Sequence, residues 1–187
     1  MPLVLGLTGL AGCGKGAVSD YLVKEHKFVK FVFSDVLREE AHKRRLLKTK
    51  NLEEQKSILS KLGDDLRKES GRKGILAEML INKIKINKVE KFIADGFRST
   101  EEVKLFRKNF KNFYLILVDT DEVIRFSRRK LDDTNATLED FQERDKRDIE
   151  EKGLGKVLEM ADFSINNEKE GLDFLYKEIE KILKLIH

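Results

Sequence analysis

The stretch GLTGLAGCGKGAVSDYL, residues 6–22, decides the fold that the sequence predicts. It begins inside an apolar run, LVLGLT at 3–8, and ends in a helical pattern. Gly9, Gly14 and Lys15 have the spacing of a phosphate-binding loop, which is a glycine, four residues, then glycine and lysine. Backbone that carries few side chains lets amide N–H groups turn toward an anion, and the start of the following helix adds positive potential. The stretch therefore predicts a cradle for the phosphates of a nucleotide, with the lysine reaching the outer phosphates.

Short apolar runs alternate with longer helical patterns along the chain, which is typical of a parallel sheet covered by crossover helices. The last helix has the clearest pattern, because apolar residues from Leu172 to Ile186 recur at spacings of three and four. We therefore expect an α/β chain with the three-layer P-loop NTPase fold, in which helices cover both faces of a five-stranded parallel sheet. The expected strands are residues 3–8, 28–33, 91–95, 113–119 and 162–166.

Two segments are too long to be plain connections between strands. Residues 34–90 carry helical patterns at 36–47, 58–66 and 75–84, and they predict an inserted helical region that binds the acceptor. Residues 125–155 are densely charged with both signs and predict a mobile flap, or lid. We expect both segments to be embedded in one domain, 1–187, whose core is formed by residues 1–33, 91–124 and 156–187.

The composition bounds the possible partners. Among 187 residues, 38 Lys and Arg nearly balance 34 Asp and Glu, and this balance does not favour nucleic acid as a partner. The single cysteine, Cys13, forms no intramolecular disulfide, and the three scattered histidines offer no metal-ligand spacing. No apolar run reaches the roughly 18 residues of a membrane span, and no targeting segment is recognisable. We expect a cytoplasmic protein without a membrane partner.

The loop departs from the common phosphate-loop form at one position. Gly16 stands where a Ser or Thr hydroxyl normally reaches the magnesium ion, and the next residue is Ala17. Mg²⁺ bound with ATP would then be held mostly by phosphates, water and another residue. Cys13 inside the loop is interpreted as a small space-filling residue. The residues expected to bind ATP in this segment are Gly9, Gly12, Cys13, Gly14, Lys15, Gly16 and Ala17.

The Gly-Lys-Gly form of the loop resembles that of the adenylate kinase family, in which threonine usually follows. Two further motifs continue the resemblance: FSDVLREEA at 33–41 is similar to the segment that opens the monophosphate-binding region, and ADGFRST at 94–100 to an Asp-Gly-Phe-Pro-Arg motif without its proline. The middle of the chain, residues 59–84, is closer to adenylate kinase-related and dephospho-CoA kinase-like proteins of archaea and uncultured bacterial lineages.

The resemblance implies roles for residues of these motifs. Arg38 would grip the acceptor phosphate, Arg98 would form a second clamp, and Asp95 would hold magnesium through water. A forked guanidinium suits this task because it binds two phosphate oxygens at once. The implied catalytic set is Lys15, Arg38, Asp95, Arg98 and Arg129. The implied acceptor-binding set is Ser34, Asp35, Arg38, Asp95, Arg98 and Arg144.

The charged segment resembles the lid of the same family. Arginines closing from a lid stabilise the charge on the transferred phosphoryl group and exclude water. ADFSINN at 161–167 is similar to the last strand and turn, which pack against the donor adenine. The residues that the resemblance adds to the ATP-binding set are Arg125, Arg128 and Asn167.

The first functional hypothesis is a nucleoside monophosphate kinase that uses ATP with Mg²⁺ and a small phosphorylated acceptor. The alternative is a dephospho-CoA kinase-like kinase of an alcohol, which needs a carboxylate to accept the hydroxyl proton, and Asp35 is the available residue. A slow regulatory ATPase is a third possibility. A GTPase is not favoured because no Asn-Lys-x-Asp motif occurs. The acceptor base and the oligomeric state stay open.

Overall fold

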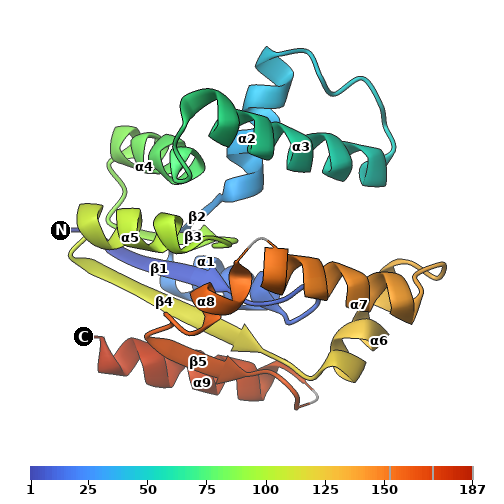
Figure 1. Ribbon diagram of the computed structural model, residues 1–187. Helices are drawn as coiled ribbons and strands as arrows, with labels where there is room; N and C mark the ends of the chain where they lie inside the picture. The colour runs from blue at the N-terminus through green and yellow to red at the C-terminus, as the bar shows by residue number, and fades with distance from the viewer. Residues whose placement is uncertain (152, 170, 187) are drawn as a thin grey trace.

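The computed structural model describes residues 1–151, 153–169 and 171–186, and this part of the chain forms one five-stranded parallel sheet (Figure 1). The strand order β2-β3-β1-β4-β5 puts the first strand at the centre. The predicted P-loop NTPase fold is confirmed, and each predicted strand is present with its ends shifted by at most one residue. The strands are β1 (Leu3–Thr8), β2 (Val29–Val32), β3 (Lys91–Asp95), β4 (Asn112–Asp119) and β5 (Phe163–Asn166).

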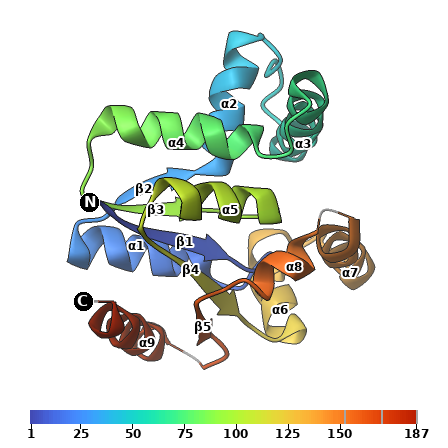
Figure 2. The same ribbon diagram turned by 60° about the vertical axis from the view of Figure 1, so that its left-hand side comes forward.

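The sheet is buried on both faces, as an all-parallel sheet requires. Helices α1 (Lys15–His26) and α9 (Leu172–Leu185) cover one face, and α4 (Ile75–Asn87) and α5 (Thr100–Asn109) lie on the other (Figure 2). Alternate residues of β1 therefore enter different cores: Leu5 packs with α1 and α9, whereas Val4 packs with α4 and α5. The predicted helical stripe at the C-terminal end of the chain is confirmed in α9.

Register brings the ends of three strands to one edge of the sheet. Leu7 of β1 is paired with Asp95 of β3 and with Ile116 of β4, and the amide of Gly96 donates to the carbonyl of Leu7 at 3.1 Å. The loops that follow β1 and β3 are therefore neighbours. In such sheets ligands bind outside the carboxyl ends of the strands.

Phe97 anchors the loop after β3 in the core. Its ring centroid lies 5.0 Å from Phe33, 4.8 Å from Phe106 and 5.5 Å from Phe113. Gly6 in β1 is needed beside these rings, since an added Cβ would lie 2.8 Å from both Phe97 and Phe113. Packing of Phe97 thus fixes the backbone from which the next residue, Arg98, leaves the core.

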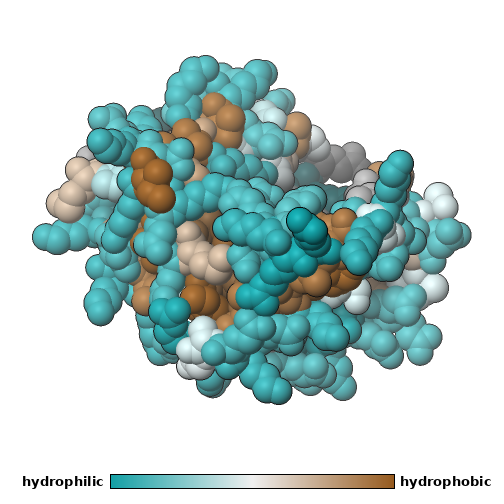
Figure 3. All heavy atoms as spheres, turned by 90° about the horizontal axis from the view of Figure 1, so that it is seen from above, coloured by the Kyte–Doolittle hydropathy of each residue, from teal (hydrophilic) through white to brown (hydrophobic). Residues whose placement is uncertain are grey.

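The segment after β2 is helical, as predicted. It contains α2 (Phe33–Lys43), α3 (Leu52–Ser70) and α4. The first helix is shorter than its apolar pattern suggested, because the chain turns at Arg45, whose φ is +55°. Apolar residues of α3 and α4 share one core cluster with Phe92 of β3 and Phe106 of α5. The outer surface above these helices is largely hydrophilic (Figure 3).

The charged segment after β4 also consists of short helices. These are α6 (Glu122–Asp132), α7 (Leu138–Lys146), a π-helical turn (Arg147–Glu151) and α8 (Leu154–Leu158). Thr137 caps α7 by accepting from the amide of Asp140. None of the helices in the described ranges is both long and apolar enough to cross a bilayer.

Candidate active site

The loop after β1 has backbone that only glycine adopts easily. The φ angles of Gly9, Gly12 and Gly14 are +141°, +80° and +102°. A Cβ at Gly9 would lie 2.3 Å from the carbonyl oxygen of Val118, and one at Gly14 would lie 2.2 Å from Nδ2 of Asn167. Glycine is therefore required at these positions for two reasons, the positive φ angle and the close approach of neighbouring segments.

Side chains from α6 and from the residues just after β4 and β5 hold the outside of this glycine loop. They donate hydrogen bonds to three successive carbonyls: Arg125 to Ala11 (3.1 Å), Arg128 to Gly12 (3.3 Å), and Thr120 and Asn167 to Cys13 (2.9 Å each). Because the C=O and N–H of a peptide point in opposite directions, carbonyls held on the outside favour amide hydrogens turned inward. Three residues that the sequence assigned to ATP binding, Arg125, Arg128 and Asn167, thus contact the loop itself.

Lys15 begins α1 and folds over the loop. Its ammonium donates to the carbonyls of Gly9 at 2.7 Å and Leu10 at 3.1 Å, and lies 3.4 Å from Sγ of Cys13. Cys13 is buried, in agreement with its interpretation as a space-filling residue. Gly14 precedes the helix without a side-chain cap among the described residues, so the first amides of α1 are left for an anion.

A cleft of about 340 Å³ lies against the loop and collects positive side chains from separate elements. Five of its cations belong to the predicted site, and their gathering gives the cleft a positive potential suited to phosphates. The sixth, on α3, was missed because a lysine on a charged helix has no distinguishing pattern. The cations are Lys15, Arg98, Arg128, Arg129, Arg144 and, on α3, Lys56.

Two carboxylates are influenced by these cations, and of the two only Asp148 lines the cleft. Asp95 ends β3, and its Oδ2 lies 3.8 Å from Nζ of Lys30 on β2. Burial raises the pKa of Asp95, while Lys15, Lys30 and Arg98 act in the opposite direction. Asp148, from the π-helical turn, lines the cleft with only 6% of its side chain exposed and lies 3.9 Å from Arg98. The sequence analysis identified Asp95 but neither Lys30 nor Asp148.

Glu102 fixes the position from which Arg98 leaves its loop. Its Oε2 accepts from the amides of Arg98 at 2.9 Å and Ser99 at 3.1 Å, and Ser99 in turn caps α5. Burial raises the pKa of Glu102, whereas the amide of Arg98 and the guanidinium of Arg67 favour its charged form. The sequence pattern for this arrangement was available, since Ser99 and Glu102 have the spacing of a capping box.

Besides Asp95, which ends β3 without lining the cleft, three predicted acceptor residues on α2 are not brought to the cleft. Arg38 on α2 donates to Ser34 at 3.1 Å and to Asp35 at 2.9 Å, and half of its side chain, 49%, is exposed. None of the three is among the residues that line the cleft. Their roles toward an acceptor stay predictions.

Gly16 and Ala17 occupy the first turn of α1, and nothing lies within 4 Å of a Cβ built on Gly16. Ser19 does not supply the missing hydroxyl, because its Oγ donates to the carbonyl of Lys15 at 3.0 Å. In the described ranges no group of three or more His, Cys, Asp or Glu residues is arranged to hold a metal ion.

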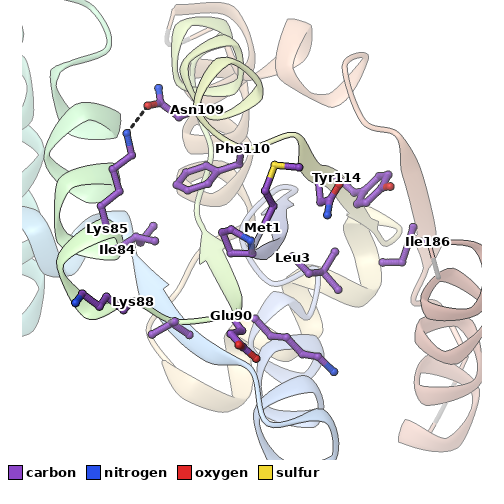
Figure 4. Close-up of a pocket in the computed structure, with 14 residues that line it drawn as sticks. Met1, Leu3, Ile84, Lys85, Lys88, Glu90, Asn109, Phe110, Tyr114 and Ile186 are labelled. Carbon is purple, nitrogen blue, oxygen red and sulfur yellow. Dashed lines mark hydrogen bonds between the residues drawn. The ribbon is translucent and has the colours of Figure 1, made fainter.

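A larger hollow of about 710 Å³ lies at the other end of the sheet (Figure 4). Leu3, Phe110 and Tyr114 contribute to its apolar lining, and Lys85 at its rim donates to Asn109 at 2.8 Å. The glycine loop is not part of it. The glycine loop and its neighbouring arginines therefore lie at the smaller cleft and not at this hollow.

Comparison with known proteins gives the family of the chain. A family model described as an AAA domain matches residues 8–152. The UPF0200 protein of Methanothermobacter thermautotrophicus is 34% identical over 176 residues, which cover 89% of this chain and 82% of the relative. That of Pyrococcus furiosus is 35% identical over 190 residues and covers 98% and 97%. The chain belongs to the AAA domain family and to the UPF0200 family.

Solved structures similar to this UPF0200 protein share its fold. Shikimate kinase from Bacteroides thetaiotaomicron superposes with a TM-score of 0.62 over 98% of both chains at 13% identity. TT1252 from Thermus thermophilus superposes with a TM-score of 0.60 over 99% of this chain and 96% of its own at 14% identity. The fold is therefore the P-loop NTPase fold that these two structures share.

Proposed function

We propose that this UPF0200 protein transfers the terminal phosphate of ATP to a small phosphorylated acceptor, with a nucleoside monophosphate as the leading candidate. The observation that carries the proposal is the convergence of Arg98, Arg129 and Arg144, from three different elements, on the cleft that also contains the glycine loop and Lys15. In the proposal the phosphate chain of ATP occupies the glycine loop. The additional arginines provide positive charge for a second anionic group, the phosphate of the acceptor. The resemblance of the phosphate loop and of the segment at 94–100 to adenylate kinases supports the same acceptor class.

Phosphoryl transfer requires mainly that the reactants are positioned and that the developing charge is stabilised. Phosphoryl transfer spreads negative charge over the equatorial oxygens, and an acceptor phosphate is already ionised near neutral pH. In the proposed reaction the loop amides and Lys15 bind the donor phosphates, Arg98 and Arg144 orient the acceptor, and Arg129 stabilises the charge in transit. Arg129 also pairs with Asp133 at 2.9 Å, which directs its guanidinium.

Mg²⁺ bound with ATP belongs to the proposal, and the residues fit such an ion. Magnesium in kinase sites uses one or two carboxylates, substrate phosphates and water rather than a cage of protein ligands. Asp95 is the carboxylate beside the loop, and the absence of a hydroxyl at Gly16 leaves the remaining ligands to phosphate and water. When bound, the ion would neutralise charge on the donor phosphates.

A kinase of an alcohol, such as dephospho-CoA, is the second candidate because Asp148 lies in the cleft. An alcohol must lose its proton during transfer, and a carboxylate within reach of the hydroxyl would accept it. Asp148 is better placed for this role than Asp35, which pairs with Arg38 outside the cleft-lining set.

Product analysis tests the two candidates. The protein is incubated with ATP and Mg²⁺ together with each nucleoside monophosphate, with dephospho-CoA, or with water alone. Nucleoside diphosphate and ADP in equal amounts are the expected products. Phosphorylation of dephospho-CoA alone would favour the second candidate, and Asp148→Asn should then abolish turnover. ADP and inorganic phosphate in every arm would instead indicate the slow ATPase and contradict phosphotransfer.

A further inference from the structure

The most deeply buried ion pair near the cleft joins two of the segments that form it. Arg125 on α6 and Asp145 on α7 lie 2.6 Å apart, Nη1 to Oδ2, with only 5% and 8% of their side chains exposed. Removing two charges from water costs several kcal/mol per ion, so such a pair often adds little to stability compared with apolar residues of the same size. Stability alone therefore does not explain why this buried pair is present.

Arg125 uses its remaining hydrogen-bonding directions on the phosphate loop and its support. Nε donates to the carbonyl of Thr120 at 3.0 Å, and Nη1 donates to the carbonyl of Ala11 at 3.1 Å. The backbone is equally close, since a Cβ at Gly12 would lie 2.9 Å from the carbonyl oxygen of Arg125. The guanidinium thus fills the space between the loop and α7.

The charged form of Asp145 is stabilised by Arg125. Burial raises the pKa of Asp145, and the guanidinium of Arg125 opposes this change. Both of its carboxylate oxygens are buried and neither makes a hydrogen bond among the described residues, so Asp145 contacts Arg125 as an ion pair. Nη1 of Arg125 both faces the carboxylate of Asp145 and donates to the carbonyl of Ala11, so attraction to the carboxylate keeps this nitrogen where it reaches the loop.

Helix α7 carries side chains of the cleft on the same turns. Arg144 precedes Asp145 and lines the cleft, as does Phe141, whose ring centroid lies 5.2 Å from Cζ of Arg125. A shift of α7 would therefore move Arg144 and disturb the contact between Arg125 and the loop together.

We infer that Asp145 is a positioning residue, which acts through Arg125 to hold the carbonyl of Ala11 and so keeps the phosphate loop in register with the helix that presents Arg144. Asp145 itself lies outside the cleft-lining residues. This inference rests on the proposed function, because it assigns the loop and α7 to the same pair of phosphate-bearing ligands.

Two variants separate positioning from mere stabilisation. Asp145→Asn keeps the shape of the side chain but removes its charge. The double variant Arg125→Met/Asp145→Leu replaces the pair with apolar side chains and is expected to regain the wild-type thermal midpoint. In both variants, amide hydrogen exchange at residues 11–14 should become about tenfold faster, and the dissociation constant for ATP with Mg²⁺ should rise about tenfold. A purely structural pair predicts that the double variant recovers both quantities along with its stability.

Glu143→Gln is the matched control, because Glu143 is an exposed acid on the same helix. It should leave exchange and ATP affinity unchanged. Wild-type exchange at residues 11–14 in a folded double variant overturns the inference. If the double variant does not fold, wild-type exchange in Asp145→Asn overturns it equally. The exchange measurement needs no nucleotide, so a wild-type protein that transfers no phosphate would contradict the proposed function and leave this comparison decisive.

Discussion

The two ends of the sheet carry hollows of opposite character. At the amino ends of the strands lies the larger one, about 710 Å³, whose lysines Lys85, Lys88 and Lys91 are exposed at the rim. At the carboxyl ends lies the smaller cleft, about 340 Å³, with the glycine loop and cations from several elements. Volume and positive charge are thus present at both ends, but only the second end adds backbone amides arranged around a loop.

The difference follows from strand direction. In a parallel sheet, every strand that leads into a covering helix points the amino end of that helix toward the carboxyl edge, where free N–H groups and the helix dipole favour anions. The lysines at the amino edge are exposed residues, and Lys85 donates to the side chain of Asn109. The chemistry of a hollow is therefore better judged from what converges on it than from its size.

Lys15→Ala is the strongest test of this contrast. Loss of the ammonium beside the loop should lower kcat/KM about 1,000-fold, or ~4 kcal/mol of transition-state stabilisation, with little change in the thermal midpoint. Lys91→Ala at the other end is the matched control and should leave turnover unchanged. Steady-state kinetics with ATP and the accepted monophosphate provide the measurement. A loss within about tenfold for Lys15→Ala would remove it from the proposed phosphate ligands.

Arg98→Ala tests which residues of the cleft at the carboxyl ends of the strands bind the acceptor. The variant loses a forked contact to the acceptor, so the KM for the acceptor should rise about 30-fold while the KM for ATP changes little. Arg38→Ala tests the more distant clamp that the sequence predicted, and its acceptor KM should rise less because Arg38 is half exposed and paired with Asp35. Unchanged acceptor KM in both variants would refute the assignment of either clamp.

Glu102→Ala tests whether the conformation of the loop after β3 affects stability and acceptor binding. The amides of Arg98 and Ser99 would lose their acceptor in a buried place, which should cost about 2 kcal/mol of unfolding free energy. Urea denaturation measures this loss. The acceptor KM should rise as well, since Arg98 leaves the same loop. Glu101→Ala, at a half-exposed neighbour, should change neither quantity, and a similar loss in that variant would assign the effect to α5 as a whole.

Tyr21→Phe provides the smallest effect, at a place away from both hollows. Tyr21 and His26 on α1 contact Glu180 on α9 at 2.7 Å and 2.6 Å. The hydrogen bond from Tyr21 lowers the pKa of Glu180, and the same bond raises the pKa of Tyr21 to about 12. A lowered carboxylate pKa contributes stability above its ordinary value of 4.5, and this contribution is lost as the pH falls through the folded value.

The thermal midpoint of Tyr21→Phe should therefore lie slightly below that of the wild type at pH 7. The difference should shrink as the pH falls below about 4.5, where Glu180 is protonated in the unfolded chain. Thermal melts followed by circular dichroism across pH 3–7 are the measurement, and turnover at pH 7 should be unchanged. A difference that widens in acid would contradict the role given to this hydrogen bond.

Most of the fold was determined by local sequence signals. The apolar runs predicted the five strands, and the glycine spacing predicted the loop, because burial on both faces and positive φ angles each restrict which residues can stand at a position. Parallel register then brought Asp95 and Arg98 beside Lys15 without further information. These features depend on short stretches of chain and on the common direction of the strands.

Other parts of the candidate site were decided only by the tertiary structure. Lys56 enters the cleft from α3, Asp148 enters it from a π-helical turn, and Asp145 reaches Arg125 across two helices. In the sequence each belongs to a charged segment that reads as a solvated surface, with no periodicity to distinguish a cleft residue from its neighbours. The packing of distant helices decides which of these charged side chains are buried. A local sequence pattern contains no information about that packing.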